Sequence, residues 1–349
     1  MKRAKKIILG IVAALVVSYV AGGITAAFVV DGIVFERRGS DESKLKNVEY
    51  RLRYQREDYP SLATREVYSV PSNGNRLAGY FYKAEPSKGV VITAHGMNSL
   101  SDGLDVAYQQ WFCSQGYSVF ALDLTASGRS EGTSMVGLHR SALDVQCAYN
   151  FLQSNGLLRG KTILCGHSWG GFGAAMSVCL GVKADAVITF SAFANTFDTM
   201  VSYASQKVGP LAYATIPTFY LGTAMKHGAS AFYDAAKAVR ESASKFLVIH
   251  GEKDKSVPLS ETSLYGKTKD YPNVSTVLLP DIGHEAPWES LAAKEYLQKD
   301  VLPKLEELKQ EGASTEELDT FISSVDKSRS SELNTDLFAT IQSFLEGIQ

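Results

Sequence analysis

The residues Gly166 to Gly170 have the types and spacing of a serine nucleophile site. They read Gly-His-Ser-Trp-Gly, so a glycine stands two positions on either side of Ser168. An apolar run precedes them and small residues follow, which predicts a strand, a sharp turn and a helix. Glycines at 166 and 170 permit the tight turn that places the serine hydroxyl above a sheet. We expect Ser168 to be a nucleophile, with a glycine-rich turn that has no chemistry as the alternative.

A serine hydroxyl needs a base, and His284 is the best candidate among the six histidines. It follows the last apolar strand-like run, and loops of this kind meet at the carboxyl edge of a parallel sheet, where ligands bind. His139 and His227 lie in helix-like segments, His167 occupies the variable position of the turn, and we expect His250 to be structural.

The acid that orients the base is predicted to be Asp254, in the loop after the strand-like run 246–249. The chain order is then serine, aspartate, histidine, as is usual when the nucleophile sits on such a turn. The rivals are Glu252, Asp281 and Asp198, each of which would otherwise be a solvated carboxylate.

An acyl-transfer intermediate also needs two backbone amides that point at its oxyanion. Trp169, directly after the nucleophile, supplies one amide. Met97, in the segment His95-Gly96-Met97-Asn98 after the first buried strand, is expected to supply the other.

The elements around these residues predict an α/β protein. Two alternating segments flank an Asn-Gly turn and predict an antiparallel hairpin, and six short apolar runs after it resemble strands buried on both faces of a parallel sheet. The hairpin covers 65–70 and 76–83, and the buried strands 89–94, 117–122, 161–165, 186–190, 246–249 and 275–279. Helices are predicted over 104–115, 137–153, 170–180 and 259–268. The fold class is therefore a mostly parallel, doubly wound sheet.

Two insertions interrupt this alternation. Residues 192–243 are rich in aromatic side chains and predict a small helical cap whose rings mostly pack on one another. Residues 287–333 predict charged helices split at Pro303, with lysines at 294, 299, 304 and 309 on a solvated face and a capping box opening at Ser314. Residues 334–348 predict a terminal helix, and the main domain is expected to span 65–349.

The N-terminus combines four positive charges in residues 1–6 with an apolar run over 7–30. As a helix this run would be about 36 Å long, enough to cross a hydrocarbon core of about 30 Å. We predict an uncleaved anchor over 1–31, a cytoplasmic N-terminus and an extracytoplasmic domain after a linker over 32–64. A cleaved signal peptide, giving a secreted protein, and a buried core helix are the alternatives.

The remaining composition restricts the partners and cofactors. The formal net charge of −2 favours no nucleic-acid partner. Cys113, Cys147, Cys165 and Cys179 lack C-x-x-C spacing and are expected to be small buried hydrophobic residues. Neither a metal-ligand cluster nor a phosphate-binding loop is apparent, so we expect no cofactor.

With these motifs in place, the chain resembles the serine α/β-hydrolases. It is closest to the serine aminopeptidase-like or monoacylglycerol-lipase-like branch and to its membrane-anchored bacterial members, over about residues 65–284 and the last helix. The resemblance implies roles for the His95–Gly96 loop, the Ser168 turn and the loops of Asp254 and His284. Residues 123–130 depart from the family pattern D-x-R-G-x-G-x-S at Thr125 and Ala126.

The function predicted first is hydrolysis of a carboxylic ester with an acyl or lipid-like substrate, suggested by the apolar cap and the anchor. A serine peptidase is the second hypothesis, although a free amine calls for carboxylates near the pocket and residues 192–230 contain only Asp198. A non-catalytic binding protein that keeps the fold is the third.

Overall fold

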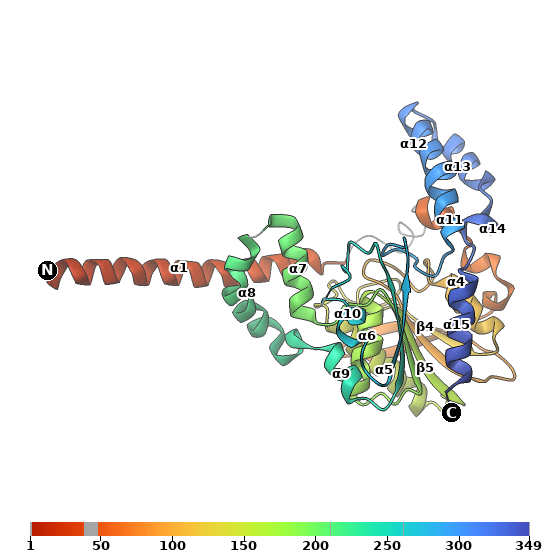
Figure 1. The fold of residues 1–349 in the computed structure, drawn as a ribbon, viewed down its shortest axis with the longest axis horizontal. Coiled ribbons are helices and arrows are strands. Elements are labelled where there is room, and N and C mark those ends of the chain that lie inside the picture. The colour runs from red at the N-terminus through yellow and green to blue at the C-terminus, as the bar shows by residue number, and fades with distance from the viewer. Residues whose placement is uncertain (1, 38–47, 210, 261, 349) are drawn as a thin grey trace.

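The computed structural model describes residues 2–37, 48–209, 211–260 and 262–348 (Figure 1). One eight-stranded sheet forms its centre, in the order β1-β2-β4-β3-β5-β6-β7-β8. The strands are β1 (Glu66–Ser72), β2 (Asn75–Tyr82), β3 (Gly89–Ala94), β4 (Ser118–Leu122), β5 (Lys161–His167), β6 (Ala186–Phe190), β7 (Lys245–Gly251) and β8 (Val274–Leu279). β2 pairs antiparallel with β1 and β4, and all other pairs are parallel, which confirms the predicted sheet with an N-terminal hairpin.

Helices cover both faces of this sheet (Figure 1). α5 (Arg140–Ser154), α6 (Trp169–Ser177), α9 (Ala235–Glu241) and α10 (Leu264–Thr268) pack on one face. α4 (Val106–Ser114) and α15 (Thr335–Glu346) pack on the other. The strands between the two layers are apolar on both faces because both faces are buried. β8 differs from the prediction, since it is the edge strand and most of its side chains are partly exposed.

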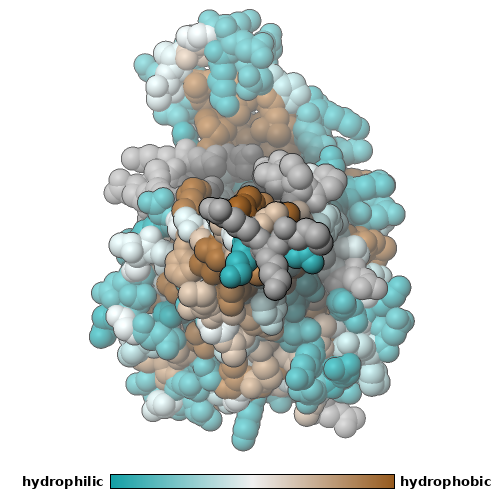
Figure 2. Space-filling model, turned by 90° about the vertical axis from the view of Figure 1, so that its left-hand side faces the viewer, coloured by the Kyte–Doolittle hydropathy of each residue, from teal (hydrophilic) through white to brown (hydrophobic). Residues whose placement is uncertain are grey.

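The N-terminal segment forms one long helix, α1 (Lys2–Val34). Residues 4–34 are long and apolar enough to cross a membrane, with a mean hydropathy of 2.5, which fits an anchor or a signal sequence. Figure 2 looks along this helix at the side of the molecule from which it emerges, and apolar side chains gather beside it there. The alternative of a buried core helix is wrong, because the side chains of Ile7, Leu9 and Leu15 are more than half exposed.

The segment that follows α1 falls in the predicted linker, of which residues 38–47 lie outside the described residues. It contains α3 (Val48–Arg51) and the short 3-10 helices η1 (Arg56–Asp58) and η2 (Pro60–Leu62). The side chains of Leu52 and Leu62 are fully buried. Residues 48–62 are therefore packed against the domain.

The cap region contains α7 (Thr196–Val208), α8 (Leu211–His227) and the 3-10 helix η4 (Gly228–Phe232). The rings of Phe197, Phe219, Tyr220 and Phe232 pack on one another at centroid distances of 4.2–5.9 Å. These four of the eight aromatic side chains in residues 192–243 form packing within the cap, whereas Tyr203 and Tyr213 are exposed and Phe193 stacks on Phe172. α8 also packs along α1.

The insertion after His284 is helical, but it is continuous through Pro303, where a break was predicted. α11 (Leu291–Tyr296) passes through one π-helical turn, η5 (Leu297–Val301), into α12 (Leu302–Gln310). Proline in a helix removes a hydrogen bond and clashes with the carbonyl four residues earlier, and the wider turn accommodates that conflict. α13 (Thr315–Ser324) begins with the predicted capping box at Ser314, and α14 (Lys327–Ser330) follows.

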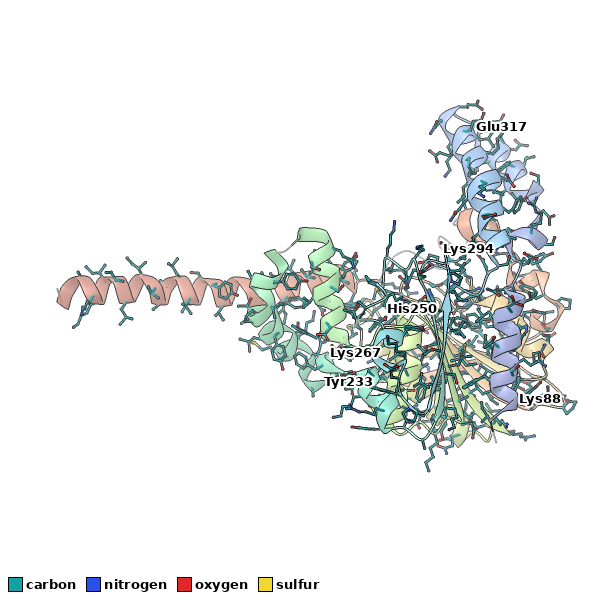
Figure 3. The ribbon with its side chains drawn as sticks, viewed as in Figure 1. Lys88, Tyr233, His250, Lys267, Lys294 and Glu317 are labelled. Atoms are coloured by element: carbon teal, nitrogen blue, oxygen red, sulfur yellow. The ribbon has the colours of Figure 1, made fainter. Side chains whose placement is uncertain are left out.

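Two predictions about exposure were wrong in this region and in the core. Lys294 is not on a solvated face, because it lies where the insertion joins the domain (Figure 3), with its ammonium 2.7 Å from the carbonyl of Glu285.

Of the cysteines, Cys165 is buried, whereas Cys179 is exposed and Cys113 and Cys147 are half-buried; all are free thiols.

Leu52 joins the N-terminal segment to the insertion, since it packs with Leu297, Val301, Leu305 and Ile322 in a small separate core. Truncating this fully buried side chain removes apolar contacts and leaves a cavity. We expect Leu52→Ala to lower the free energy of unfolding by about 2–5 kcal/mol, measured by chemical denaturation of the full chain in detergent.

The matched control is Leu291→Ala in the same insertion, because Leu291 is 47% exposed. It should change the free energy of unfolding by less than about 0.5 kcal/mol. Equal effects of the two substitutions would contradict the role given to Leu52.

Candidate active site

Ser168 stands on a strained turn between β5 and α6. Its backbone angles are φ 51° and ψ −111°, in the region that side chains rarely adopt. A Cβ at Gly170 would lie 2.0 Å from the carbonyl oxygen of Ala94, and one at Gly166 would lie 2.5 Å from the backbone of Gly170. The two glycines therefore let α6 approach the sheet closely, which holds Ser168 in this conformation.

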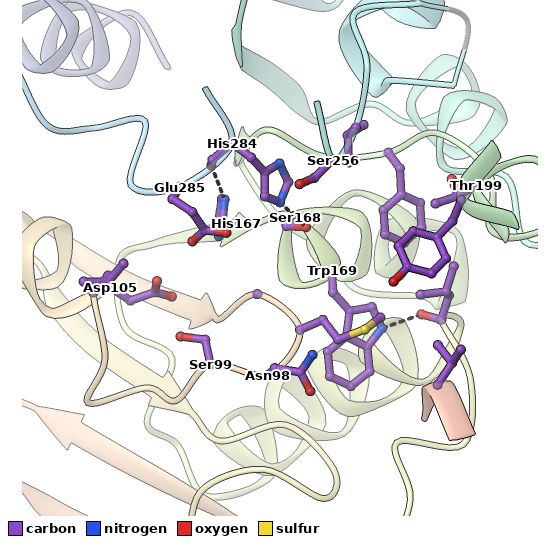
Figure 4. Close-up of a pocket in the computed structure, with 18 of the residues that line it drawn as sticks. Asn98, Ser99, Asp105, His167, Ser168, Trp169, Thr199, Ser256, His284 and Glu285 are labelled. Carbon is purple, nitrogen blue, oxygen red and sulfur yellow. Dashed lines mark hydrogen bonds between the residues drawn. The ribbon is translucent and has the colours of Figure 1, made fainter. Parts of the chain in front are cut away.

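Ser168, His284 and Asp254 form one hydrogen-bonded chain (Figure 4 shows the first two). His284 Nε2 lies 3.0 Å from Ser168 Oγ, and His284 Nδ1 lies 2.8 Å from Asp254 Oδ2. An ionised carboxylate only accepts hydrogen bonds, so Nδ1 carries the proton and Nε2 is free to accept the serine proton. The structure thus brings together the three residues predicted for nucleophile, base and acid.

The loop after β7 holds Asp254 for this contact. Asp254 Oδ1 accepts hydrogen bonds from the amides of Ser256 and Val257, at 2.9 and 2.8 Å. Burial acts to raise the pKa of Asp254, but the hydrogen bond and charge of His284 and the Val257 amide outweigh it and lower the pKa. Asp254 therefore stays ionised at neutral pH.

The three rival carboxylates lie elsewhere. Glu252 and Asp281 are exposed on either side of Lys253, at 3.6 and 4.0 Å from its ammonium. Asp198 is exposed in the first turn of α7. His250, predicted to be structural, is fully buried and lies 2.9 Å from the carbonyl oxygen of Val257, so it supports the turn that holds Asp254.

The two predicted oxyanion donors, Met97 and Trp169, line the same cavity as Ser168. Within the described part of the chain, neither backbone amide has a hydrogen-bond acceptor. Gly96 allows its loop to lie close to the turn, because a Cβ there would be 2.9 Å from His167 Nδ1. Two amides without a protein acceptor beside a serine hydroxyl favour an acceptor supplied by a substrate.

His95 supports the oxyanion loop from behind. It is buried, its Nε2 accepts the amide of Leu124 at 3.1 Å, and its Nδ1 lies 2.7 Å from the carbonyl of Gly96. The tautomer that accepts at Nε2 donates at Nδ1. His95 thereby fixes the loop that carries Met97.

His167 contributes to the site, a role that the sequence reasoning missed. Its Nε2 donates to the carbonyl oxygen of His284 at 2.9 Å, and the two rings lie 4.9 Å apart. Burial, followed by the charge of His284, lowers the pKa of His167 to about 3, so its ring is neutral at ordinary pH. A histidine at the variable position of the turn was the available signal, but only the fold shows that it reaches the base.

The cavity above Ser168 has a volume of about 450 Å³. Its apolar lining, here called the apolar half, includes Val34 at the end of α1, Leu138, Phe193, Met200 and Val257. Its polar lining, here called the polar half, includes Tyr50, Asn98, Ser99, Asp105 and Glu285, and Figure 4 shows Ser99, Asp105 and Glu285 on the same side of the cavity. Among the described residues that line the cavity, none is lysine or arginine, and two, Asp105 and Glu285, carry carboxyl groups.

Asp105 is the unusual member of the polar half. It stands at the N-cap of α4 but makes no side-chain cap bond; instead it is buried beside the cavity and accepts a hydrogen bond from Tyr108 Oη. Burial, augmented by the nearby charge of Glu285 and offset in part by Tyr108, raises the pKa of Asp105 to about 8. The sequence prediction considered carboxylates only in residues 192–230. It did not include Asp105 and Glu285, because both lie on other loops.

The other polar clusters lie outside this site. His227 pairs with Asp31 at the end of α1, and its ring lies 5.0 Å from that of His139. In the described ranges, no group of three histidine, cysteine, aspartate or glutamate side chains is arranged to hold a metal ion.

The raised pKa of Asp105 predicts a pH-dependent stability. The pKa of Asp105 in the folded protein, about 8, exceeds the reference pKa of 3.8. The protonated carboxyl therefore makes its full contribution to the free energy of unfolding below about pH 4, and this contribution is lost as the pH rises towards 8. Relative to Asp105→Asn, the wild-type free energy of unfolding should fall by up to about 1.4 kcal/mol per pH unit and then level off.

Chemical denaturation of both proteins between about pH 5 and 9 measures this difference. Glu285→Gln is the control, because Glu285 is exposed and its substitution should produce no comparable slope. A difference between wild type and Asp105→Asn that is constant with pH would contradict the buried acid.

The comparisons with known proteins agree with this architecture. Residues 85–231 match the family model described as serine aminopeptidase, S33. The esterase Pf2001 of Pyrococcus furiosus is 18% identical, with a TM-score of 0.51, covering 80% of this chain and 95% of that one. Est1E of Butyrivibrio proteoclasticus, solved with ferulic acid bound, is 15% identical, with a TM-score of 0.50, covering 70% and 99%. No curated protein matches the chain in sequence. The chain has the α/β-hydrolase fold, and over residues 85–231 it resembles the serine aminopeptidase family.

Proposed function

We propose that the protein is a serine hydrolase that cleaves carboxylic esters through an acyl-enzyme. The observation that carries this proposal is the unbroken chain from Ser168 Oγ through His284 to Asp254 at the floor of a cavity. The structural similarity to esterases from Pyrococcus furiosus and Butyrivibrio proteoclasticus supports it.

In the first half-reaction, His284 Nε2 takes the proton of Ser168 Oγ while Oγ attacks the ester carbonyl carbon. The amides of Met97 and Trp169 donate to the oxyanion, and Asp254 stabilises the imidazolium through its Nδ1 proton. The tetrahedral intermediate collapses, the C–O bond breaks, and the alcohol leaves with the proton from Nε2. Water then repeats these steps on the acyl-enzyme and releases the acid.

The cavity suggests how an ester would lie. Its apolar half fits an acyl chain, and the helix α1, which supplies Val34 to that half, would keep the site near a membrane. We infer that α1 is an uncleaved anchor over residues 1–31, with its basic end in the cytoplasm and the hydrolase domain outside. The 192–243 region would act as the cap of that domain.

Replacing the nucleophile tests the reaction. Ser168→Ala should lower hydrolysis of p-nitrophenyl esters by about 10³-fold or more, because the covalent step is lost. The assay uses the full chain in detergent and esters from acetate to palmitate, together with labelling by a fluorophosphonate.

Ser323→Ala is the control, since this serine is exposed on α13. It should keep wild-type turnover and labelling. Wild-type activity in Ser168→Ala would refute the proposal, and a folded wild type that resists the fluorophosphonate would favour a binding protein.

The polar half of the cavity favours a second candidate, a serine peptidase that binds the amine of its substrate. An ammonium group placed between Asp105 and Glu285 would find two carboxyl groups without a cation in the cavity wall. Asp105 would then ionise, because a nearby positive charge lowers a carboxyl pKa.

Substrates with and without an amine separate the two candidates. If the polar half binds a cation, Asp105→Asn should reduce kcat/KM for an amino-acid p-nitroanilide by about 10-fold or more, because one charge-assisted contact is lost. The neutral ester p-nitrophenyl butyrate should change by less than about three-fold. The peptidase candidate fails if the wild type releases no amino-acid reporter while it hydrolyses the neutral ester.

A further inference from the structure

α8 and α1 run side by side in the same direction and touch at every fourth residue. The successive pairs are Tyr19 with Ala214, Gly23 with Thr218, Ala27 with Gly222, and Asp31 with Lys226. A Cβ at Gly23 would overlap the Thr218 side chain, and one at Gly222 would lie 2.7 Å from Ala27 Cβ. Small residues at such a seam let two helices approach as closely as helix pairs do within membranes.

The two helices change from apolar to charged at the same level. α1 has no charged side chain from Ile7 to Val30 and then Asp31; α8 has none from Leu211 to Met225 and then Lys226. The seam joins these boundaries directly, because Asp31 bonds both Lys226 and His227. The apolar part of α8 therefore lies beside the apolar part of α1.

The outer side of α8 is apolar as well. Tyr213, Leu221 and Met225 are 58%, 43% and 63% exposed, and Phe28 and Val29 of α1 are exposed nearby along the seam. Figure 2 shows that apolar surface gathers around α1 on this side of the molecule. A helix that has no charged side chain from Leu211 to Met225 and exposes apolar side chains beside α1 is stabilised by apolar surroundings, which α1 needs too.

We propose that α8 is a second membrane-inserted helix, lying beside α1 in the outer leaflet, and that the hydrolase takes its ester from a bilayer lipid. The substrate part of this proposal rests on the proposed ester hydrolysis. From Tyr19 to Asp31 the seam covers twelve residue steps, about 18 Å at the helical rise, close to the depth of one leaflet.

The cavity is placed for such a substrate. Val34, in its apolar half, follows Asp31 by three residues, about 4.5 Å along the helix axis. Met200 and Tyr203 of α7 line the same cavity. An acyl chain that rises out of the leaflet beside α1 would meet these side chains first, without crossing water.

Depth-dependent quenching tests the insertion directly. A tryptophan is placed at Leu221→Trp and, as a matched control, at Thr320→Trp on the exposed side of α13. Of the three native tryptophans, Trp169 and Trp288 are fully buried and Trp111 is half-buried, and all three contribute the same background to both variants. The full chain is reconstituted in vesicles of phosphatidylcholine with or without bromine on the acyl chains.

Leu221→Trp should lose about two-fold of its added fluorescence in the brominated vesicles, because its ring lies among the acyl chains, whereas Thr320→Trp should not change. Equal quenching of the two variants would overturn the insertion of α8. This measurement needs no turnover, so its failure leaves the proposed ester hydrolysis untouched.

A charge on α8 tests the substrate route. Because a carboxylate is strongly disfavoured among acyl chains, Leu221→Glu should reduce hydrolysis of an acyl ester embedded in vesicles by about 10-fold or more. Hydrolysis of soluble p-nitrophenyl acetate should stay within about two-fold of wild type, and Leu221→Ala should keep both rates. Equal losses on both substrates, or no loss on either, would overturn the lipid route. A wild type inactive on the soluble ester would instead refute the proposed function.

Discussion

The site depends on how closely α6 packs against the sheet behind Ser168. The Cβ positions of Gly166 and Gly170 are occupied by backbone atoms of neighbouring elements, so no side chain fits there. This contact forces Ser168 into an unfavourable backbone conformation, and the surrounding core has to hold it. The core does so with Trp169, which is fully buried and donates from its indole nitrogen to the carbonyl of Leu138.

The remaining groups reach Ser168 because parallel strands end at one edge. Asp254 follows β7, His284 follows β8, and the loop of Met97 follows β3, although they are far apart in the sequence. Each loop is then fixed by a second layer: His250 behind Asp254, His167 against His284, and His95 behind the Met97 loop. Three of the six histidines thus support the loops around Ser168.

The sequence carried the parts of this structure that depend on local pattern. The strands and their antiparallel hairpin could be read from apolar runs and an Asn-Gly turn, and Ser168, Asp254 and His284 from their places after strands. What it could not supply is contact between distant segments. Asp105 and Glu285 lie on loops outside the cap. The continuous helix through Pro303 depends on a π-helical turn that the local sequence pattern does not predict. Thr125, which departs from the family pattern, joins a buried network with Asp144 and Arg140 that is visible only in three dimensions.

The helix α1 does not end before the catalytic domain but continues into it, with Val34 in the cavity wall and the Phe35 side chain in the main core. A domain attached in this way cannot rotate freely relative to α1, so its orientation to the bilayer would be set by the helix itself. Encounter with a membrane-borne substrate would then be a search in two dimensions. Saturation would follow the mole fraction of ester in the bilayer rather than its bulk concentration, and diluting the vesicles at constant composition would leave the rate per enzyme unchanged.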